Sequence, residues 1–141
     1  MDTDEDSLVL TGNADPHVAT LGELNPVTEK IIGCAYTVSN GLGAGFLEKV
    51  YENALAHEMR KGGLKVTQQQ SFRVLYDNVE VGYYEADIVV EGKVLVELKA
   101  VRSLDEVHRA QCMNYLRASG LRICLLINFA TPRIQIKRIA R

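Results

Sequence analysis

Two charged residues interrupt an apolar stretch near the middle of the chain. Residues 94–101 read VLVELKAV, in which Glu97 and Lys99 stand among residues typical of a buried strand. A buried, unpaired charge costs on the order of several kcal/mol, so both residues need compensation. Because side chains alternate along a strand, Glu97 and Lys99 point to one face, while Val94 and Leu98 point to the other. The pattern predicts an acid and a base that share one face of a sheet.

A third charged residue, Asp87, interrupts the preceding apolar strand. Residues 90–93 join the two strands as a hairpin. A two-residue loop would pair Asp87 with Val96 and send it to the opposite face, whereas an odd-numbered loop places it on the face of Glu97. Gly92 suits the left-handed position of a three-residue loop with a bulge. We therefore expect the odd-numbered loop, with Asp87 and Glu97 on the same face.

An Asp and a Glu that converge across a hairpin repel each other, and a hard divalent cation relieves that repulsion. Carboxylate oxygens, a backbone carbonyl and waters form the shell that Mg²⁺ prefers, and Mn²⁺ is an alternative. Such an ion activates water and neutralises charge on a scissile phosphate. Lys99 can hold the attacking water or help to deprotonate it. Glu48 can supply a further carboxylate, directly or through water, and Glu85 is a secondary candidate.

Glu48 belongs to a predicted amphipathic helix over residues 46–63. In helical projection Glu48 falls at one edge of the apolar arc, where its side chain can reach inward. Glu52, Glu58 and Lys49 fall away from that edge and are expected to face solvent.

The remaining elements follow from periodicity and from start and stop signals. We expect a first helix from Asn25-Pro26 to Asn40-Gly41, and a later one that a capping box opens at Ser103 and that ends near Gly120. Strands are expected over residues 66–78, 79–90, 93–100, 121–128 and 133–139, with the last strand at an edge. The order α-α-β-β-β-α-β-β predicts an α/β fold, with a mixed sheet flanked by helices.

The composition indicates a soluble protein with one core. The chain has 141 residues, of which 47% are hydrophobic and 24% are charged. It contains no apolar run of eighteen residues, so we expect no membrane span, and the acidic N-terminus does not resemble a secretory signal. Three cysteines without a C-x-x-C motif fit reduced thiols, and we expect a cytoplasmic protein.

Charge is distributed unevenly along the chain. Residues 1–24 contain six acids and no Lys or Arg, and we expect a flexible leader there. Residues 25–141 then form a single domain with a net charge of about +4. A mildly basic body is compatible with a nucleic-acid partner.

Four short motifs together resemble the PD-(D/E)XK nuclease superfamily. Asp87, a gap of nine residues and then Glu97-Leu98-Lys99 resemble its signature, although Ala86 stands where that signature often has proline. Residues 45–51 (GFLEKVY) resemble the name-giving motif of the GxxExxY family, and residues 125–129 (LLINF) match a late strand of the same family. Residues 111–115 (QCMNY) resemble the Q-x-x-x-Y element of the exonuclease-like branch of the superfamily.

The resemblance implies a restriction-endonuclease-like fold and a role for each matching residue. Asp87 and Glu97 would be metal ligands, Lys99 the catalytic lysine, Glu48 the acid supplied by the helix, and Gln111 a contact near the site. Tyr51 and Tyr115 would be supports that pack and orient. The implied activity is Mg²⁺-dependent hydrolysis of phosphodiester bonds, with DNA favoured over RNA. Because the domain is nearly all catalytic core, self-association or a protein partner would supply sequence specificity.

Other interpretations of the same residues remain open. Glu97 and Lys99 can form a surface ion pair, and Asp87 can be a strand-end residue in a polar turn. Glu48 can be a solvated helix residue, and Gln111 a satisfied buried amide. At the level of function, the alternatives are a catalytically silent nucleic-acid-binding or regulatory module that retains the fold, and a metal-stabilised structural subunit.

Overall fold

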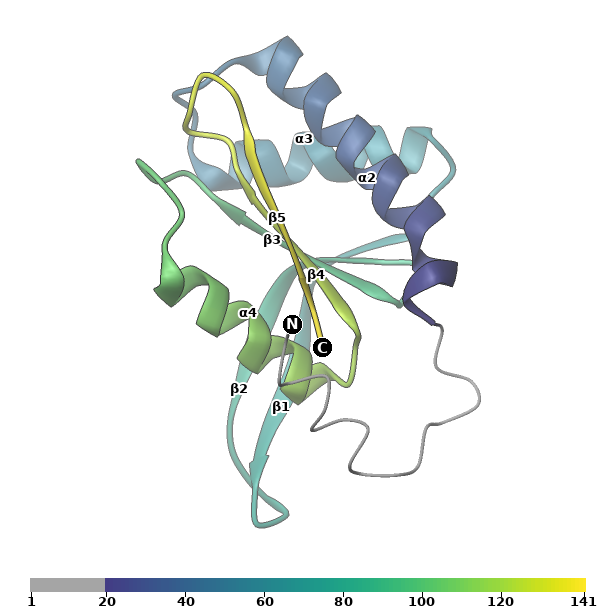
Figure 1. Cartoon of the computed structure of the whole chain (residues 1–141), viewed down its shortest axis with the longest axis vertical. Coiled ribbons are helices and arrows are strands. Elements are labelled where there is room, and N and C mark those ends of the chain that lie inside the picture. The colour runs from purple at the N-terminus through teal and green to yellow at the C-terminus, as the bar shows by residue number, and fades with distance from the viewer. Residues whose placement is uncertain (1–19) are drawn as a thin grey trace.

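A five-stranded mixed sheet with helices on both faces makes up residues 20–141, the part of the chain that the computed structural model describes (Figure 1). The sheet order is β1-β2-β3-β4-β5; β3 and β4 pair in parallel, and the other neighbours pair antiparallel. The predicted element order, mixed sheet and edge position of the last strand are confirmed. The elements are α2 (Leu21–Leu42), α3 (Glu48–Lys61), β1 (Val66–Tyr76), β2 (Val79–Val90), β3 (Val94–Lys99), α4 (Glu106–Ser119), β4 (Ile123–Asn128) and β5 (Gln135–Ala140).

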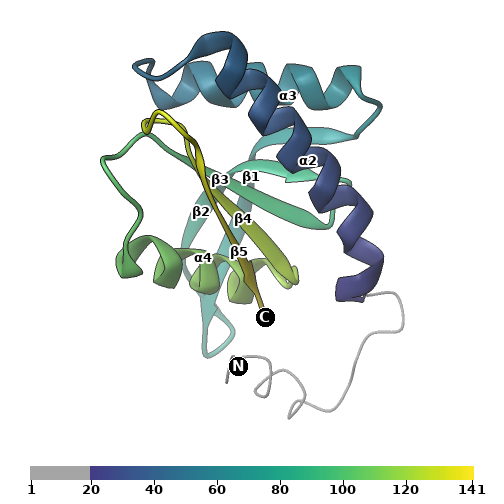
Figure 2. The ribbon, with the colours of Figure 1, turned by 45° about the horizontal axis from the view of Figure 1, so that its top comes forward.

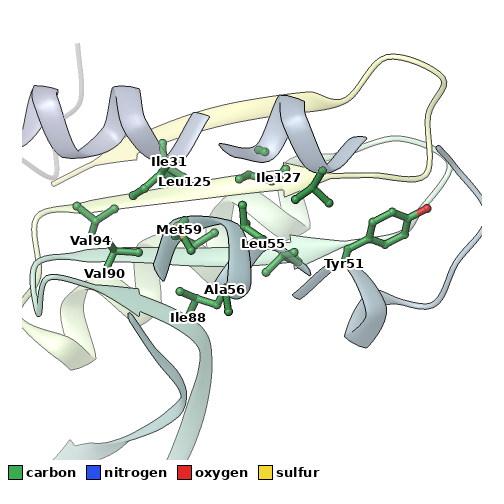
Figure 3. Packing of buried hydrophobic residues seen from close by; sticks show 14 of the residues in the cluster. Ile31, Tyr51, Leu55, Ala56, Met59, Ile88, Val90, Val94, Leu125 and Ile127 are labelled. Atoms are coloured by element: carbon green, nitrogen blue, oxygen red, sulfur yellow. The ribbon is translucent and has the colours of Figure 1, made fainter. Parts of the chain in front are cut away.

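The helices divide the apolar core into two layers. Helices α2 and α3 cover one face of the sheet, and α4, the crossover between the parallel strands, covers the other (Figures 1 and 2). Each fully buried large aliphatic side chain contributes about 1.5–3 kcal/mol, so the two layers fix how the helices lie on the sheet. Figure 3 shows the first layer, in which side chains of α2 and α3 (Ile31, Leu55, Ala56, Met59) pack over strand residues (Ile88, Val90, Val94, Leu125, Ile127).

The first helix begins earlier than the expected start at Asn25. Thr20 caps it, because its hydroxyl accepts from Glu23 N at 3.2 Å and its own N–H donates to Glu23 Oε1 at 3.0 Å. This capping box places Pro26 inside the helix. Residues 21–24, expected in the flexible leader, are therefore the first turn of α2, and residues 1–19 lie outside the described residues. The helix also ends two residues late, at Leu42.

Asp105, rather than the expected Ser103, caps α4. Its carboxylate accepts from the backbone N–H of Val107 at 3.0 Å and of His108 at 3.4 Å, and His108 Nδ1 accepts from Asp105 N. The predicted end is confirmed, since Gly120 takes the left-handed conformation, with φ +77°.

The hairpin between β2 and β3 has the predicted odd-numbered loop. Val90 pairs with Val94, which leaves three residues in the loop, and Gly92 takes φ +65°. The register continues through Ile88 opposite Val96. Asp87 therefore comes opposite Glu97, and not opposite Val96.

Pairing between β1 and β2 is interrupted beside Asp87. Gln69, with φ +54°, is skipped between two regular pairs. The packing of β2 changes there: Ile88 joins the layer under α2 and α3, whereas Ala86 joins the layer under α4. The ribbon of β1 and β2 then extends past α4 to its turn (Figure 1).

Candidate functional site

Hydrogen bonds connect the carboxylates of Asp87 and Glu97 to each other's strands. The backbone N–H of Asp87 donates to Glu97 Oε2 at 3.1 Å, and the N–H of Leu98 donates to Asp87 Oδ2 at 2.9 Å. Each carboxylate therefore uses one oxygen to bond the backbone of the opposite strand. The two acids are fixed side by side at the point where regular pairing stops.

Burial and like charge raise the pKa of both carboxyl groups. Glu97 is 6% exposed, and burial, with a further contribution from the charge of Asp87, raises its pKa to about 9. The pKa of Asp87 is also raised, mainly by burial and then by the charge of Glu52. A polar turn does not account for Asp87, because it lies within β2.

Lys99 is the last residue of β3. By strand alternation its side chain points to the same face of the sheet as that of Glu97, and it is partly buried. Its charge favours ionised Glu97 and lowers the pKa of that group, against the larger effect of burial. Within residues 20–141, the Lys99 ammonium forms no ion pair. The interpretation of Glu97 and Lys99 as a surface ion pair is therefore wrong.

Glu48 begins α3 and reaches the end of β3. It is exposed, and its Oε2 accepts from Ala100 N at 3.3 Å. Tyr51 holds the turn that precedes Glu48. Its hydroxyl donates to Gly43 O at 2.6 Å and accepts from Phe46 N at 3.1 Å. These bonds tie the turn before α3 to the helix, and the role of Tyr51 as a support of the site stays a prediction.

Glu52 is a buried acid that the sequence analysis assigned to solvent. It is 4% exposed, and its carboxylate accepts from three side chains: Gln68 Nε2 at 2.7 Å, Gln69 Nε2 at 2.9 Å and Lys49 Nζ at 3.0 Å. Gln69 Nε2 also lies 3.4 Å from Asp87 Oδ1. Two features could have indicated this network: Glu52 lies one turn after Glu48, and residues 68–70 are three consecutive glutamines in a strand.

Gln111 and Glu85 are not brought to the carboxylates by any hydrogen bond among the described residues. Both side chains are exposed, Gln111 on α4 and Glu85 on β2. The interpretation of Gln111 as a buried amide is therefore wrong, and its contact near the site stays a prediction. Tyr115, four residues further along α4, is stacked on Tyr84 with ring centroids 4.1 Å apart.

The donor set suits a magnesium ion. In residues 20–141, no three His, Cys, Asp or Glu side chains form a metal-binding group, and the expected role of Glu48 as a further ligand stays a prediction. Mg²⁺ is usually held by one or two carboxylates and keeps several waters. Glu97 Oε1 accepts no hydrogen bond among the described residues, and Asp87 Oδ1 accepts only the long one from Gln69. Two adjacent acids with raised pKa fit such an ion, because a cation offsets their repulsion.

Comparison with known proteins gives a family and a fold. A search of curated proteins found no match. The crystal structure of SSO0001 is similar with a TM-score of 0.54 at 17% sequence identity, over 84% of this chain and 59% of that one. This chain thus spans less than two thirds of that structure, and the likeness concerns the fold. None of the helices in residues 20–141 is long and apolar enough to cross a membrane.

The model of one protein family matches nearly all of the described chain. It is the model described as the PD-(D/E)XK nuclease superfamily, and it matches residues 25–139. That range contains the mixed sheet except for Ala140, and the helices except for the first turn of α2. The restriction-endonuclease-like fold expected from the sequence is confirmed by this match and by the structural similarity. The chain belongs to the PD-(D/E)XK nuclease superfamily.

Proposed function

We propose that the protein is a metal-dependent nuclease that hydrolyses phosphodiester bonds. One observation carries the proposal: Glu97, which is buried, and Asp87, which is partly buried, bond to each other's strands on the hairpin that ends in Lys99. Removing carboxylates from water destabilises the folded state, and groups with perturbed pKa values that cluster in this way are typical of functional sites.

Each residue of the cluster has a proposed role. Asp87 and Glu97 would hold Mg²⁺, or Mn²⁺ in its place, and the ion supplies activated water and neutralises charge on the phosphate. The Lys99 ammonium would orient the attacking water and stabilise the negative charge of the transition state. Glu48, held at the end of β3 by Ala100 N, would accept a hydrogen bond from a water at the mouth of the site. Gln111 remains a proposed contact.

The branch of the superfamily and the preferred substrate are proposed from the sequence motifs. The arrangement of Glu48 and Tyr51 on α3 supports placement in the GxxExxY branch of the superfamily. DNA is proposed as the substrate in preference to RNA. We further propose a cytoplasmic location, consistent with three free cysteines, and specificity that comes from self-association or from a protein partner.

A cleavage assay with matched variants tests the proposal. Labelled single-stranded and duplex DNA and RNA are incubated with Mg²⁺, Mn²⁺ or EDTA. We expect metal-dependent product from the wild type and a loss of at least about 100-fold in Asp87→Asn and in Lys99→Ala, a size typical of catalytic groups. Glu85→Gln, an exposed acid on the same strand, is the control and should keep full activity. Equal product from all four proteins would show that the cleavage came from a contaminant.

Calorimetric titration separates the nuclease from the alternatives. Binding of Mg²⁺ without any product, on every nucleic acid tested, would favour a structural metal site. Binding of nucleic acid without product or metal dependence would favour a silent binding module.

A further inference from the structure

A groove that the proposed chemistry does not use runs between the β1–β2 ribbon and α4. Its volume is about 520 Å³. Sites of about 300–1,000 Å³ hold small organic molecules, so the groove suits one or two nucleotides rather than a duplex. Its lining includes Arg73 from β1, Tyr84 from β2, and Asn114, Tyr115 and Arg117 from α4.

The groove is positively charged. Arg73 and Arg117 line it from opposite sides, and the lining contains no Asp or Glu. Arg73 is 3.9 Å from Glu80, but both side chains are more than half exposed, and solvent weakens such a pair. Arg117 Nη1 donates to Asn114 Oδ1 at 3.1 Å, which orients the guanidinium along α4. An anion in the groove would therefore meet two guanidinium groups.

Two further arginines, Arg122 and Arg141, lie near Arg117. Burial lowers the pKa of Arg141, and the like charges of Arg122 and Arg117 lower it further. The end of α4 thus carries a group of arginines that repel one another. A bound polyanion would relieve this repulsion.

Tyr84 and Tyr115 line the groove, and Phe72 lies behind Tyr84. Phe72, Tyr84 and Tyr115 form a continuous stack, with centroid distances of 5.4 Å and 4.1 Å and interplanar angles of 21° and 9°. Tyr84 also donates its hydroxyl to Tyr115 O at 3.0 Å, so the stack is rigid. Tyr84 lies between the other two rings, so of the tyrosines that line the groove only Tyr115 has a ring face that the stack leaves uncovered. An unpaired base can pack against that face, whereas the bases of a duplex are already stacked on each other.

The groove leads toward the two acids. Tyr84 precedes Asp87 by three residues on β2, which is about 10 Å along a strand. Burial raises the pKa of Tyr115, and the charges of Glu97 and Asp87 raise it further. Tyr115 is therefore within electrostatic range of the carboxylates.

We propose that this groove binds a single-stranded segment of nucleic acid and directs it to Asp87 and Glu97, with phosphates between Arg73 and Arg117 and an unpaired base against Tyr115. The idea rests on the proposed nuclease function, and it specifies the form of the substrate. A strand end or an unpaired stretch would enter, and a continuous duplex would not.

Fluorescence anisotropy in EDTA tests the groove without any cleavage. The full chain is titrated into a labelled 12-nucleotide DNA single strand and into the matching duplex. The variant Arg73→Gln/Arg117→Gln should bind the single strand at least about tenfold more weakly. The binding of this variant should also depend less on salt. The magnitude of the slope of log K against log salt should decrease by about 1.4, because each phosphate contact to a single strand contributes about 0.7. Wild-type binding of the duplex should be weaker than that of the single strand.

The control variant removes the same charge elsewhere. Lys30→Gln/Lys61→Gln neutralises two exposed lysines on α2 and α3, which cover the other face of the sheet. It should bind like the wild type, and thermal melting should show that both double variants are folded. Equal weakening in both variants, equal loss for duplex and single strand, or no binding by the wild type would overturn the groove proposal. Absence of cleavage together with the expected binding losses would overturn only the nuclease function.

Discussion

Glu52 and Asp87 share one hydrogen-bond donor, the side-chain amide of Gln69. Gln69 Nε2 lies 2.9 Å from Glu52 Oε1 and 3.4 Å from Asp87 Oδ1. The same amide belongs to the residue that β1–β2 pairing skips, with φ +54°, a conformation that a non-glycine residue rarely adopts. The bond to the buried Glu52 therefore offsets the backbone strain and fixes a donor beside Asp87.

Replacing Glu52 should destabilise the protein and disturb the site. Glu52→Ala would remove an acceptor from the amides of Gln68 and Gln69 and from the ammonium of Lys49, at a cost of about 2–4 kcal/mol. Gln68 would keep its bond to Asn53, and Gln69 its long bond to Asp87. We expect this loss in the free energy of unfolding from urea denaturation. Glu58→Ala, on the same helix, removes only an ion pair with Lys61 and should cost under about 1 kcal/mol. Equal losses in both variants would contradict the network.

Replacing Glu97 by Gln should stabilise the metal-free protein at high pH. The folded pKa is about 9 and the usual value is 4.5, so the folded state binds the proton more tightly. This contribution to stability is fully present below the usual pKa and is lost as the pH rises toward the folded pKa. The neutral amide has no such loss. Because one pKa unit corresponds to about 1.4 kcal/mol, we expect Glu97→Gln to gain at least about 1 kcal/mol at pH 8, or about 3 °C in Tm.

The pH series is the internal check for that variant. At pH 4 the difference between wild type and Glu97→Gln should vanish, because Glu97 is protonated in both folded and unfolded chains. A Glu85→Gln control should show no gain at either pH, since Glu85 is exposed. A wild type whose stability relative to Glu97→Gln does not change between pH 4 and pH 8 would show that Glu97 is not held in the environment described.

Magnesium should stabilise the wild type at pH 8 through the two acids. A ligand at tenfold excess over its Kd stabilises the folded state by about 1.4 kcal/mol. We expect a matching rise in Tm with MgCl₂, measured against KCl at the same ionic strength. The rise should be absent in Asp87→Asn and in Glu97→Gln. A rise of the same size in those variants would place the ion elsewhere.

Removing the hydroxyl of Tyr51 should loosen the start of α3 while the ring stays packed. Tyr51→Phe loses the bonds to Gly43 O and from Phe46 N but keeps the stack on Phe129 at 4.7 Å. We expect a cost of about 1–2 kcal/mol in unfolding free energy, and a lower kcat, since Glu48 lies one turn away. Tyr36→Phe, on an exposed ring, is the control and should change neither quantity. An unchanged kcat would separate Glu48 from the chemistry.

Local pattern was sufficient to predict the strands and the relation between the acids. Alternation assigned Glu97 and Lys99 to one face, and the parity of the hairpin loop predicted that Asp87 would join them, as the register shows. These features depend on neighbours within about ten residues of chain, where backbone geometry alone sets which side chains share a face.

Helix starts were predicted less well because several residues compete to cap the same turn. Asn25 and Ser103 are good caps by type, yet Thr20 and Asp105 were used. Two factors decided which residue became the cap in each helix. One was which side chain could accept hydrogen bonds from the N–H groups of the first turn, and the other was how that turn packs. Leu24, for example, is 2% exposed, and its burial in the core stabilises a helix that begins before this residue.

The sequence by itself determined the order of elements, the mixed sheet and the pairing of Asp87 with Glu97, because these follow from periodicity and loop length. Only the tertiary structure decided that Glu52 is buried, that Gln69 joins it to Asp87, and that Gln111 stays exposed. The reason is physical: whether a helical glutamate meets water or an amide depends on the strand that packs beside it. That strand, β1, comes from a distant part of the chain, and its contribution is set by the fold as a whole.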